Sequence, residues 1–172
     1  MQLSMHQASA PVFLRGLNNT SVLIDKALAH CEVKKIDPEV LVNYRLAPDM
    51  LPFKNQIYIM TDSAKGCVAR LAGVEIPSFP DTESTLGELK ERLAKTAAFV
   101  KGFDATQIDG TEDKDILLQL GPANARVEME FKGAQFLLGF VLPNFFFHAT
   151  TAYAILRHCG VEIGKRDFLG GL

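Results

Sequence analysis

The residues best suited to chemistry lie in a phenylalanine-rich stretch, residues 143–160. Asn144, His148 and Thr151 stand at positions i, i+4 and i+7, so in a helix their side chains share one face. An imidazole beside an amide and a hydroxyl can act as a general base, hydrogen-bond a ligand or contribute to a metal site. The rest of the stretch is apolar enough for a protein core, where polar groups need partners. His148 is therefore the candidate catalytic residue.

A metal at His148 would need at least two further ligands. Four residues upstream stands Asn144, whose neutral amide oxygen is a weaker donor for Zn or Ni than an imidazole. On an earlier helix, Gln56 is the inward polar residue expected at the same level. Two arrangements remain open. Gln56, Asn144 and His148 could close a hydrogen-bonded network, or they could line a small polar pocket together with Thr151 and Tyr153.

Helical periodicity predicts four long helices that must position these side chains. We expect them at residues 3–34 (starting late or kinked at Pro11), at 53–72, at 82–102 and at 143–160, with short helices at 38–43 and 134–142. Strand patterns at 115–120 and 125–131, joined by turn residues 121–124, predict a β-hairpin. The sequence thus predicts an all-α, single-domain protein over residues 1–172, a four-helix bundle with at least one crossover connection and an accessory β-hairpin before the last helix.

Two details of the predicted helices can be tested against a structure. Gly66, inside the second long helix, costs about 1 kcal/mol relative to Ala, which predicts a close helix crossing there. The third long helix carries charges of alternating sign, for which a solvated face is the favoured interpretation and a docking surface the alternative. These residues are Glu88, Lys90, Glu91, Arg92 and Lys95.

Composition excludes several classes of function. A net charge of −2 and a pI near 6.1 argue against nucleic acid or an anionic membrane as partner. No apolar run of about 18 residues or secretory signal is evident, so we expect a cytoplasmic protein. Cys31, Cys67 and Cys159 are odd in number and widely spaced, which is typical of reduced, buried thiols. Phosphate loops, dinucleotide fingerprints and nucleophile elbows are absent from the sequence.

At this point the whole chain resembles the DUF1993 family of uncharacterised bacterial proteins. The matching stretches include residues 3–13 (LSMHQASAPVF), 45–50 (RLAPDM), 62–65 (DSAK), 69–73 (ARLAG), 142–157 (LPNFFFHATTAYAILR) and 164–170 (GKRDFLG). The family is more distantly similar to the DinB/YfiT-like superfamily of putative metalloenzymes, whose last helix carries His-x-x-x-His and a Leu-Arg-x-x-Gly ending. His148, Leu156, Arg157 and Gly160 match that ending in spacing.

The resemblance implies a DinB-like helical bundle and, because such bundles often pair, a homodimer. Superfamily members commonly hold a divalent metal with three histidines, and some transfer or isomerise low-molecular-weight thiol adducts. In this chain His148 matches the last of those histidines, Asn144 stands where its helix partner would be, and Gln56 is the position assigned to the first.

Together these observations predict a small-molecule-binding protein with a polar pocket at His148 and a degenerate metal site. The alternative is an enzyme, a metal-dependent or His-based transferase or hydrolase acting on a small thiol or polar metabolite. We expect no obligatory cofactor, with a divalent metal such as Zn or Ni at His148 as the alternative. The expected partners are a second copy of the chain and a small-molecule ligand, without nucleic acid or membrane.

Overall fold

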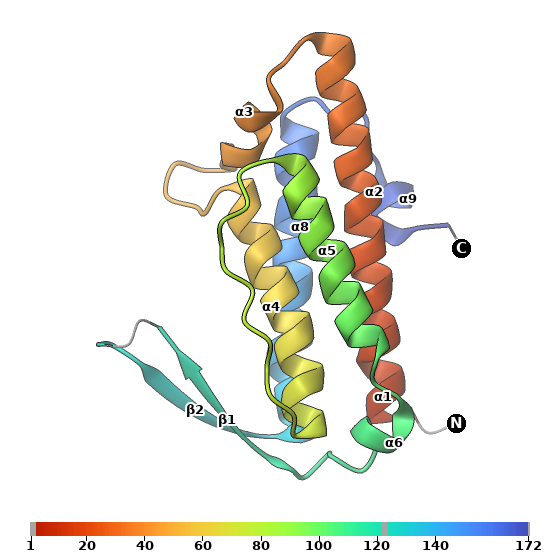
Figure 1. Ribbon diagram of the computed structural model, residues 1–172, viewed down its shortest axis with the longest axis vertical. Coiled ribbons are helices and arrows are strands. Elements are labelled where there is room, and N and C mark those ends of the chain that lie inside the picture. The colour runs from red at the N-terminus through yellow and green to blue at the C-terminus, as the bar shows by residue number, and fades with distance from the viewer. Residues whose placement is uncertain (1–2, 122–123, 172) are drawn as a thin grey trace.

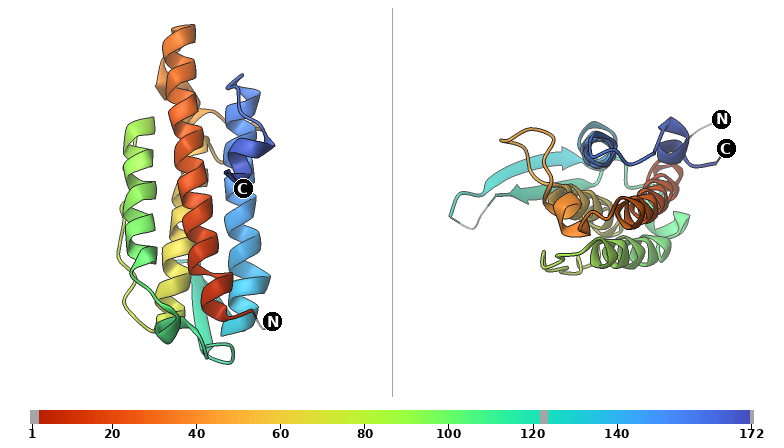
Figure 2. Two further views of the ribbon diagram at one scale, coloured as in Figure 1. Left: turned by 90° about the vertical axis from the view of Figure 1, so that its right-hand side faces the viewer. Right: turned by 90° about the horizontal axis from the view of Figure 1, so that it is seen from above.

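The computed structural model describes residues 3–121 and 124–171. Four long helices lie side by side in the order α2–α5–α4–α8 around the bundle (Figures 1 and 2). They are α2 (Ala10–Lys34), α4 (Phe53–Ala72), α5 (Leu86–Lys101) and α8 (Leu142–His158). The remaining helices are short: α1 (Met5–Ala8), α3 (Pro38–Asn43), α6 (Ala105–Ile108), α7 (Gly133–Gln135) and α9 (Lys165–Leu169). The predicted helical class is confirmed, and short helices add to the four long ones.

The two strands β1 (Asp115–Leu120) and β2 (Val127–Lys132) form an antiparallel hairpin, as predicted. Asp115 pairs with Lys132 at its base and Leu120 pairs with Val127 toward its tip. Of the four predicted turn residues, Pro122 and Ala123 lie outside the described residues. The hairpin projects from one end of the bundle (Figure 1). On β1, the side chains of Ile116 and Leu118 are buried in the core.

The helix ends follow local sequence signals. Asp37 caps α3 through the Glu39 backbone N–H, and Gly73 ends α4 in a left-handed conformation. For the helix predicted over residues 3–34 the late start is confirmed, because the chain breaks at Ser9 and the long helix α2 begins at Ala10. Pro11 then falls in the first turn of α2, where a missing N–H costs nothing.

The segment before α8 is a π-helix, η1 (Phe136–Val141), and it makes Gly133–His158 one continuous helical stretch. A regular α-helix would bring the Pro143 ring against the carbonyl of Gly139, so a widened turn directly before the proline relieves this conflict. In an α-helix, two side chains four residues apart are rotated about 40° past a full turn. In the wider π-helix the same spacing falls short of a full turn, so the two deviations offset each other along the chain. The π segment therefore helps to keep Phe136, Phe140 and Asn144 facing the same side.

By length and mean hydropathy the stretch Gly133–His158 would suffice to cross a membrane, which corrects the expectation that no segment is long and apolar enough. One side of this stretch packs in the bundle core, where Phe145 is fully buried. The Phe145 ring meets Phe13 edge-on at 5.1 Å between centroids and lies over Gly16 of α2, where a Cβ would approach it to 2.5 Å. Core packing thus accounts for part of the apolar composition of this segment, whereas Leu138, Phe146 and Phe147 remain exposed.

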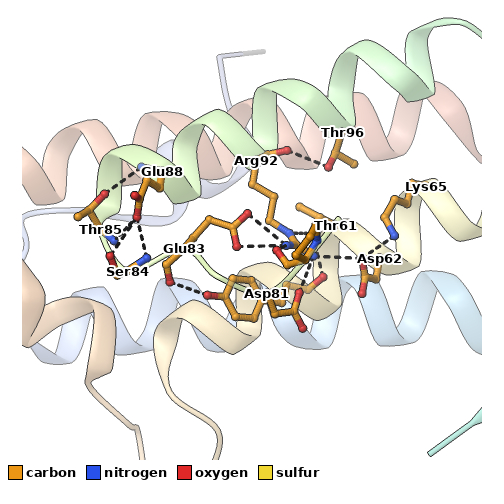
Figure 3. Close-up of polar contacts among 12 residues, drawn as sticks. Thr61, Asp62, Lys65, Asp81, Glu83, Ser84, Thr85, Glu88, Arg92 and Thr96 are labelled. Atoms are coloured by element: carbon orange, nitrogen blue, oxygen red, sulfur yellow. Dashed lines mark hydrogen bonds and ion pairs between the residues drawn. The ribbon is translucent and has the colours of Figure 1, made fainter. Parts of the chain in front are cut away.

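Helices α4 and α5 run in the same direction, so residues 73–85 return along the bundle as a crossover connection (Figure 1). This connection is held by Arg92 of α5, whose side chain is 1% exposed. The guanidinium contacts three carboxylates at 2.9 to 3.2 Å, those of Asp62, Asp81 and Glu83 (Figure 3). It also donates to the Thr61 hydroxyl and the Pro80 carbonyl, and it stacks over the Tyr58 ring.

The expectation of a solvated face on α5 is therefore wrong for Arg92. Its helix neighbours Lys90, Glu91 and Lys95 are exposed or half-buried, as predicted. Arg92 is buried because its counter-charges come from α4 and from the crossover connection, which no pattern within α5 reveals. A buried guanidinium is tolerated when its donors are satisfied and its charge is compensated.

We predict that replacing Arg92 will destabilise the fold far more than replacing one of its partners. Arg92→Met leaves Glu83 and Thr61 without their donor and should lower the free energy of unfolding by about 3 kcal/mol. The matched control Asp81→Asn removes a half-exposed carboxylate and should cost less than about 1 kcal/mol. Urea unfolding followed by circular dichroism measures both, and equal losses would contradict the assignment of Arg92 as the buried clamp.

Candidate functional site

The candidate site lies where α4 and α8 run antiparallel to each other. Gln56 of α4 faces His148 of α8, with 2.7 Å between Gln56 Oε1 and His148 Nδ1. The Gln56 amide nitrogen donates to the Leu51 carbonyl at 2.8 Å, and a carbonyl can only accept. The amide oxygen of Gln56 must therefore face the imidazole, which makes Nδ1 the protonated nitrogen of a neutral His148.

The other imidazole nitrogen of His148, Nε2, is left open. It makes no hydrogen bond to the described residues, and among these residues no buried polar side-chain atom lacks a partner, so Nε2 must be accessible to solvent. Burial lowers the pKa of His148 below its ordinary value of 6.5, because the charged form loses hydration. At neutral pH the site thus presents an unprotonated, oriented nitrogen.

One turn away, Asn144 makes the second polar contact between the two helices. Its side-chain amide donates to Ser63 Oγ at 2.8 Å, and the Ser63 hydroxyl in turn donates to the Ile59 carbonyl. His148 and Asn144 therefore belong to two separate hydrogen-bonded pairs rather than to one closed network. Each pair joins α4 to α8, and together they fix the register between these helices.

A cavity of about 430 Å³ opens beside these pairs, between α4, the η1–α8 segment and the hairpin. His148, Asn144 and Ser63 supply polar groups at one side of it. The remaining lining is mainly apolar and comes from all three elements: Ile59, Asp62 and Arg70 of α4, Leu118, Gln119 and Leu120 of β1, and Phe136, Phe140 and Val141 of η1. The hairpin thus acts as one wall of the site.

Thr151 and Tyr153, predicted as pocket residues, lie apart from this lining. The Thr151 hydroxyl donates to the Phe147 carbonyl of its own helix, and the Tyr153 ring packs against Phe168. Gln56 is not among the lining residues, and it contacts His148, which is one of them. Asn144 and His148 are the two predicted site residues that line it.

Most lining side chains were not placed in the site from the sequence, among them Ser63, Arg70 and Phe140. On α4, Ile59, Ser63 and Arg70 follow helical spacing and could have been identified from it. The hairpin contribution has no such signal, because it depends on how β1 folds back onto the bundle. The prediction of a close helix crossing at Gly66 is wrong, since a Cβ there would meet the Arg70 side chain and no other helix within 4 Å.

The donor set does not fit a three-histidine metal site. Gln56 Oε1 is engaged by His148 Nδ1–H, and the Asn144 amide is engaged by Ser63. Within the described part of the chain, no group of three or more His, Cys, Asp or Glu side chains is arranged to hold a metal ion. The pKa of the thiols of Cys31, Cys67 and Cys159 is raised, chiefly by burial, so they favour the protonated, unreactive form.

The chain resembles known proteins in both sequence and fold. The family model described as "Domain of unknown function (DUF1993)" matches residues 5–169. The chain belongs to the DUF1993 family. Among solved structures it is similar to a DinB family member protein from Shewanella denitrificans, with 36% sequence identity, a TM-score of 0.84, and coverage of 97% of this chain and 92% of that chain. No functionally curated protein matches the sequence.

The resemblance to DUF1993 stated from the sequence is thereby confirmed, and the DinB-like fold with it. In this DUF1993 protein the imidazole of His148 is oriented by an amide rather than accompanied by further imidazoles. An oriented N–H at Nδ1 is a common way to fix a histidine tautomer for a role at Nε2. The site therefore offers a hydrogen-bond acceptor or base at one defined atom.

We predict that Gln56 sets the tautomer of His148. Long-range ¹H–¹⁵N spectra above pH 6.5 should show the proton on Nδ1, and Gln56→Leu should shift it toward Nε2 because the acceptor is lost. Asn144→Ala, which removes the neighbouring pair without touching the imidazole, is the control and should leave the tautomer unchanged.

The lowered pKa of His148 also predicts how the free energy of unfolding changes with pH, which urea unfolding measures at each pH while the same spectra follow the titration. Since the folded state binds the His148 proton more weakly than the unfolded state, this residue should make the protein less stable as pH falls from 6.5 toward the lowered pKa. A His148→Gln variant should lose that part of the pH dependence. An imidazole that titrates at or above 6.5 would contradict the lowered pKa.

Proposed function

We propose that the chain binds a small molecule in the cavity between α4, the η1–α8 segment and the hairpin. The observation that carries the proposal is that His148 lines a cavity of about 430 Å³ while its Nε2 makes no hydrogen bond to the described residues. This volume is of the size that holds small ligands, and an apolar lining with a few convergent polar groups is typical of such sites. Ser63 and Asn144 supply further polar groups beside it.

The second candidate is an enzyme that uses His148 as a general base toward a small thiol or polar metabolite. The observation in its favour is the Nδ1–H anchored on Gln56, since it leaves Nε2 free to accept a proton. A neutral imidazole at physiological pH is also the form that a base requires. A metal-dependent version draws no support from the donor set around His148.

We predict that a neutral alcohol binds in the cavity through His148. Benzyl alcohol can place its ring among the phenylalanines and donate its hydroxyl proton to Nε2, so its titration should shift the His148 and Asn144 signals in NMR spectra. His148→Phe keeps a ring but loses the acceptor, and should weaken binding about fivefold, the value of one hydrogen bond of about 1 kcal/mol.

Thr151→Ala is the matched control, because Thr151 lies on the same helix outside the cavity lining. It should leave the affinity for benzyl alcohol unchanged. Shifts confined to residues outside the cavity, or none at all, would contradict a binding site at His148. Proton exchange between Nε2 and a bound thiol, followed as a pH–rate profile, separates the enzyme from the binding protein.

We also propose a homodimer that uses the outer face of α8. Phe147 is 58% exposed and Phe146 is 41% exposed, so two aromatic rings of one helix are left uncovered. A two-fold axis through this face would bury both rings in self-complementary contacts. This proposal carries forward the expectation of a homodimer from the sequence.

We predict that light scattering at micromolar concentration gives the mass of two chains for the native protein and of one chain for Phe147→Glu. The control is Val33→Glu, which puts the same charge on an apolar side chain that is 76% exposed near the end of α2. A native protein that scatters as a single chain would refute the dimer.

A further inference from the structure

Arg70 is a partly buried cation at the end of the cavity formed by η1. Its guanidinium folds back along α4, where Nη1 donates to the Gly66 carbonyl at 3.1 Å, and it lies 6.0 Å from the centre of the Phe136 ring. Across residues 3–121 and 124–171, Arg70 makes no ion pair with an aspartate or glutamate. Burial lowers the pKa of Arg70, which is the effect of removing a cation from water without a counter-charge.

The charge balance of the cavity singles out this residue. Asp62 also lines the cavity, but its carboxylate is already paired with Lys65 at 2.8 Å and with Arg92 at 3.2 Å. His148 is neutral, and Gln119 is hydrogen-bonded to Glu128 of the hairpin. Arg70 therefore supplies the one uncompensated charge among the described residues that line the cavity.

Gly66 of α4 leaves the space that the Arg70 guanidinium occupies. A Cβ on Gly66 would lie 2.6 Å from Nη1, so any other residue would push the guanidinium away from its present place. Glycine lowers helix propensity at position 66, and the space it leaves for the guanidinium is a reason for its presence there. With Nη1 tied to the Gly66 carbonyl, the Nε and Nη2 edge of the guanidinium keeps two N–H groups that can bind a carboxylate in bidentate fashion.

We propose that the ligand of this cavity is an amphipathic carboxylate, bound through its anionic group to Arg70 and through its apolar part to Phe136, Phe140 and Leu118. A single uncompensated cation in a mainly apolar lining suits a monoanion and not a doubly charged phosphate. The hydrogen bond from Nη1 to the Gly66 carbonyl holds the guanidinium near Phe136 beforehand, which lowers the entropic cost of binding. This inference rests on the proposed function, because it names the ligand class of the same cavity.

The test compares an acid with its neutral amide, 4-phenylbutanoate against 4-phenylbutanamide, by calorimetric titration of the full chain. The native protein should bind the acid about tenfold more tightly than the amide, the value of a charge-assisted hydrogen-bonded pair. Arg70→Met keeps the apolar stem and should remove this preference, because the acid then loses its counter-charge. Arg70→Lys should recover only part of it, because an ammonium lacks the bidentate geometry.

Gly66→Ala gives an independent arm that does not depend on the folding of the Arg70 variants. Alanine is the better helix former, so the variant should fold at least as well as the native protein, and the displaced guanidinium should lose most of the preference for the acid. Equal affinities for acid and amide in the native protein would overturn the carboxylate inference and leave the binding cavity standing. A failure of both probes to bind would overturn the inference and the proposed function together.

Discussion

The position of α4 depends on the buried guanidinium of Arg92. Parallel α4 and α5 require a long connection back along the bundle, and Arg92 ties that connection to both helices through Asp62, Asp81 and Glu83 (Figure 3). Such a cluster holds together only if each charge is compensated, so it specifies where the crossover must lie. With α4 fixed on that side, its opposite face meets α8 in one register.

That register is specified by polar pairs in an otherwise apolar interface. Gln56 with His148, and Ser63 with Asn144, satisfy each other across α4 and α8. A slip of one turn would separate both pairs and leave the buried Nδ1–H of His148 without its acceptor, at a cost of about 1–3 kcal/mol. The same pairs that select the register also orient the imidazole, so the stability of the interface and the geometry of the site have a common origin.

Arg92 and Arg70 differ in the groups that surround their guanidinium charges. Arg92 is surrounded by carboxylates that the chain supplies, and its charge serves the fold. Arg70 has a carbonyl and an aromatic ring as neighbours, and its charge is left for a ligand. In this DUF1993 protein the cavity is therefore lined by an acceptor at His148 and a cation at Arg70.

The sequence by itself determined the helical class, the ends of α3 and α4, the hairpin and the candidate residues His148, Asn144 and Gln56, because caps, prolines and hydrophobic periodicity act within a few residues along the chain. Only the tertiary structure decided which of them share a cavity, that Arg92 is buried, and that Gly66 makes room for Arg70. These outcomes depend on counter-charges and walls that come from segments distant in sequence. A local sequence pattern cannot predict these contacts, since burial and charge compensation are properties of the packed chain.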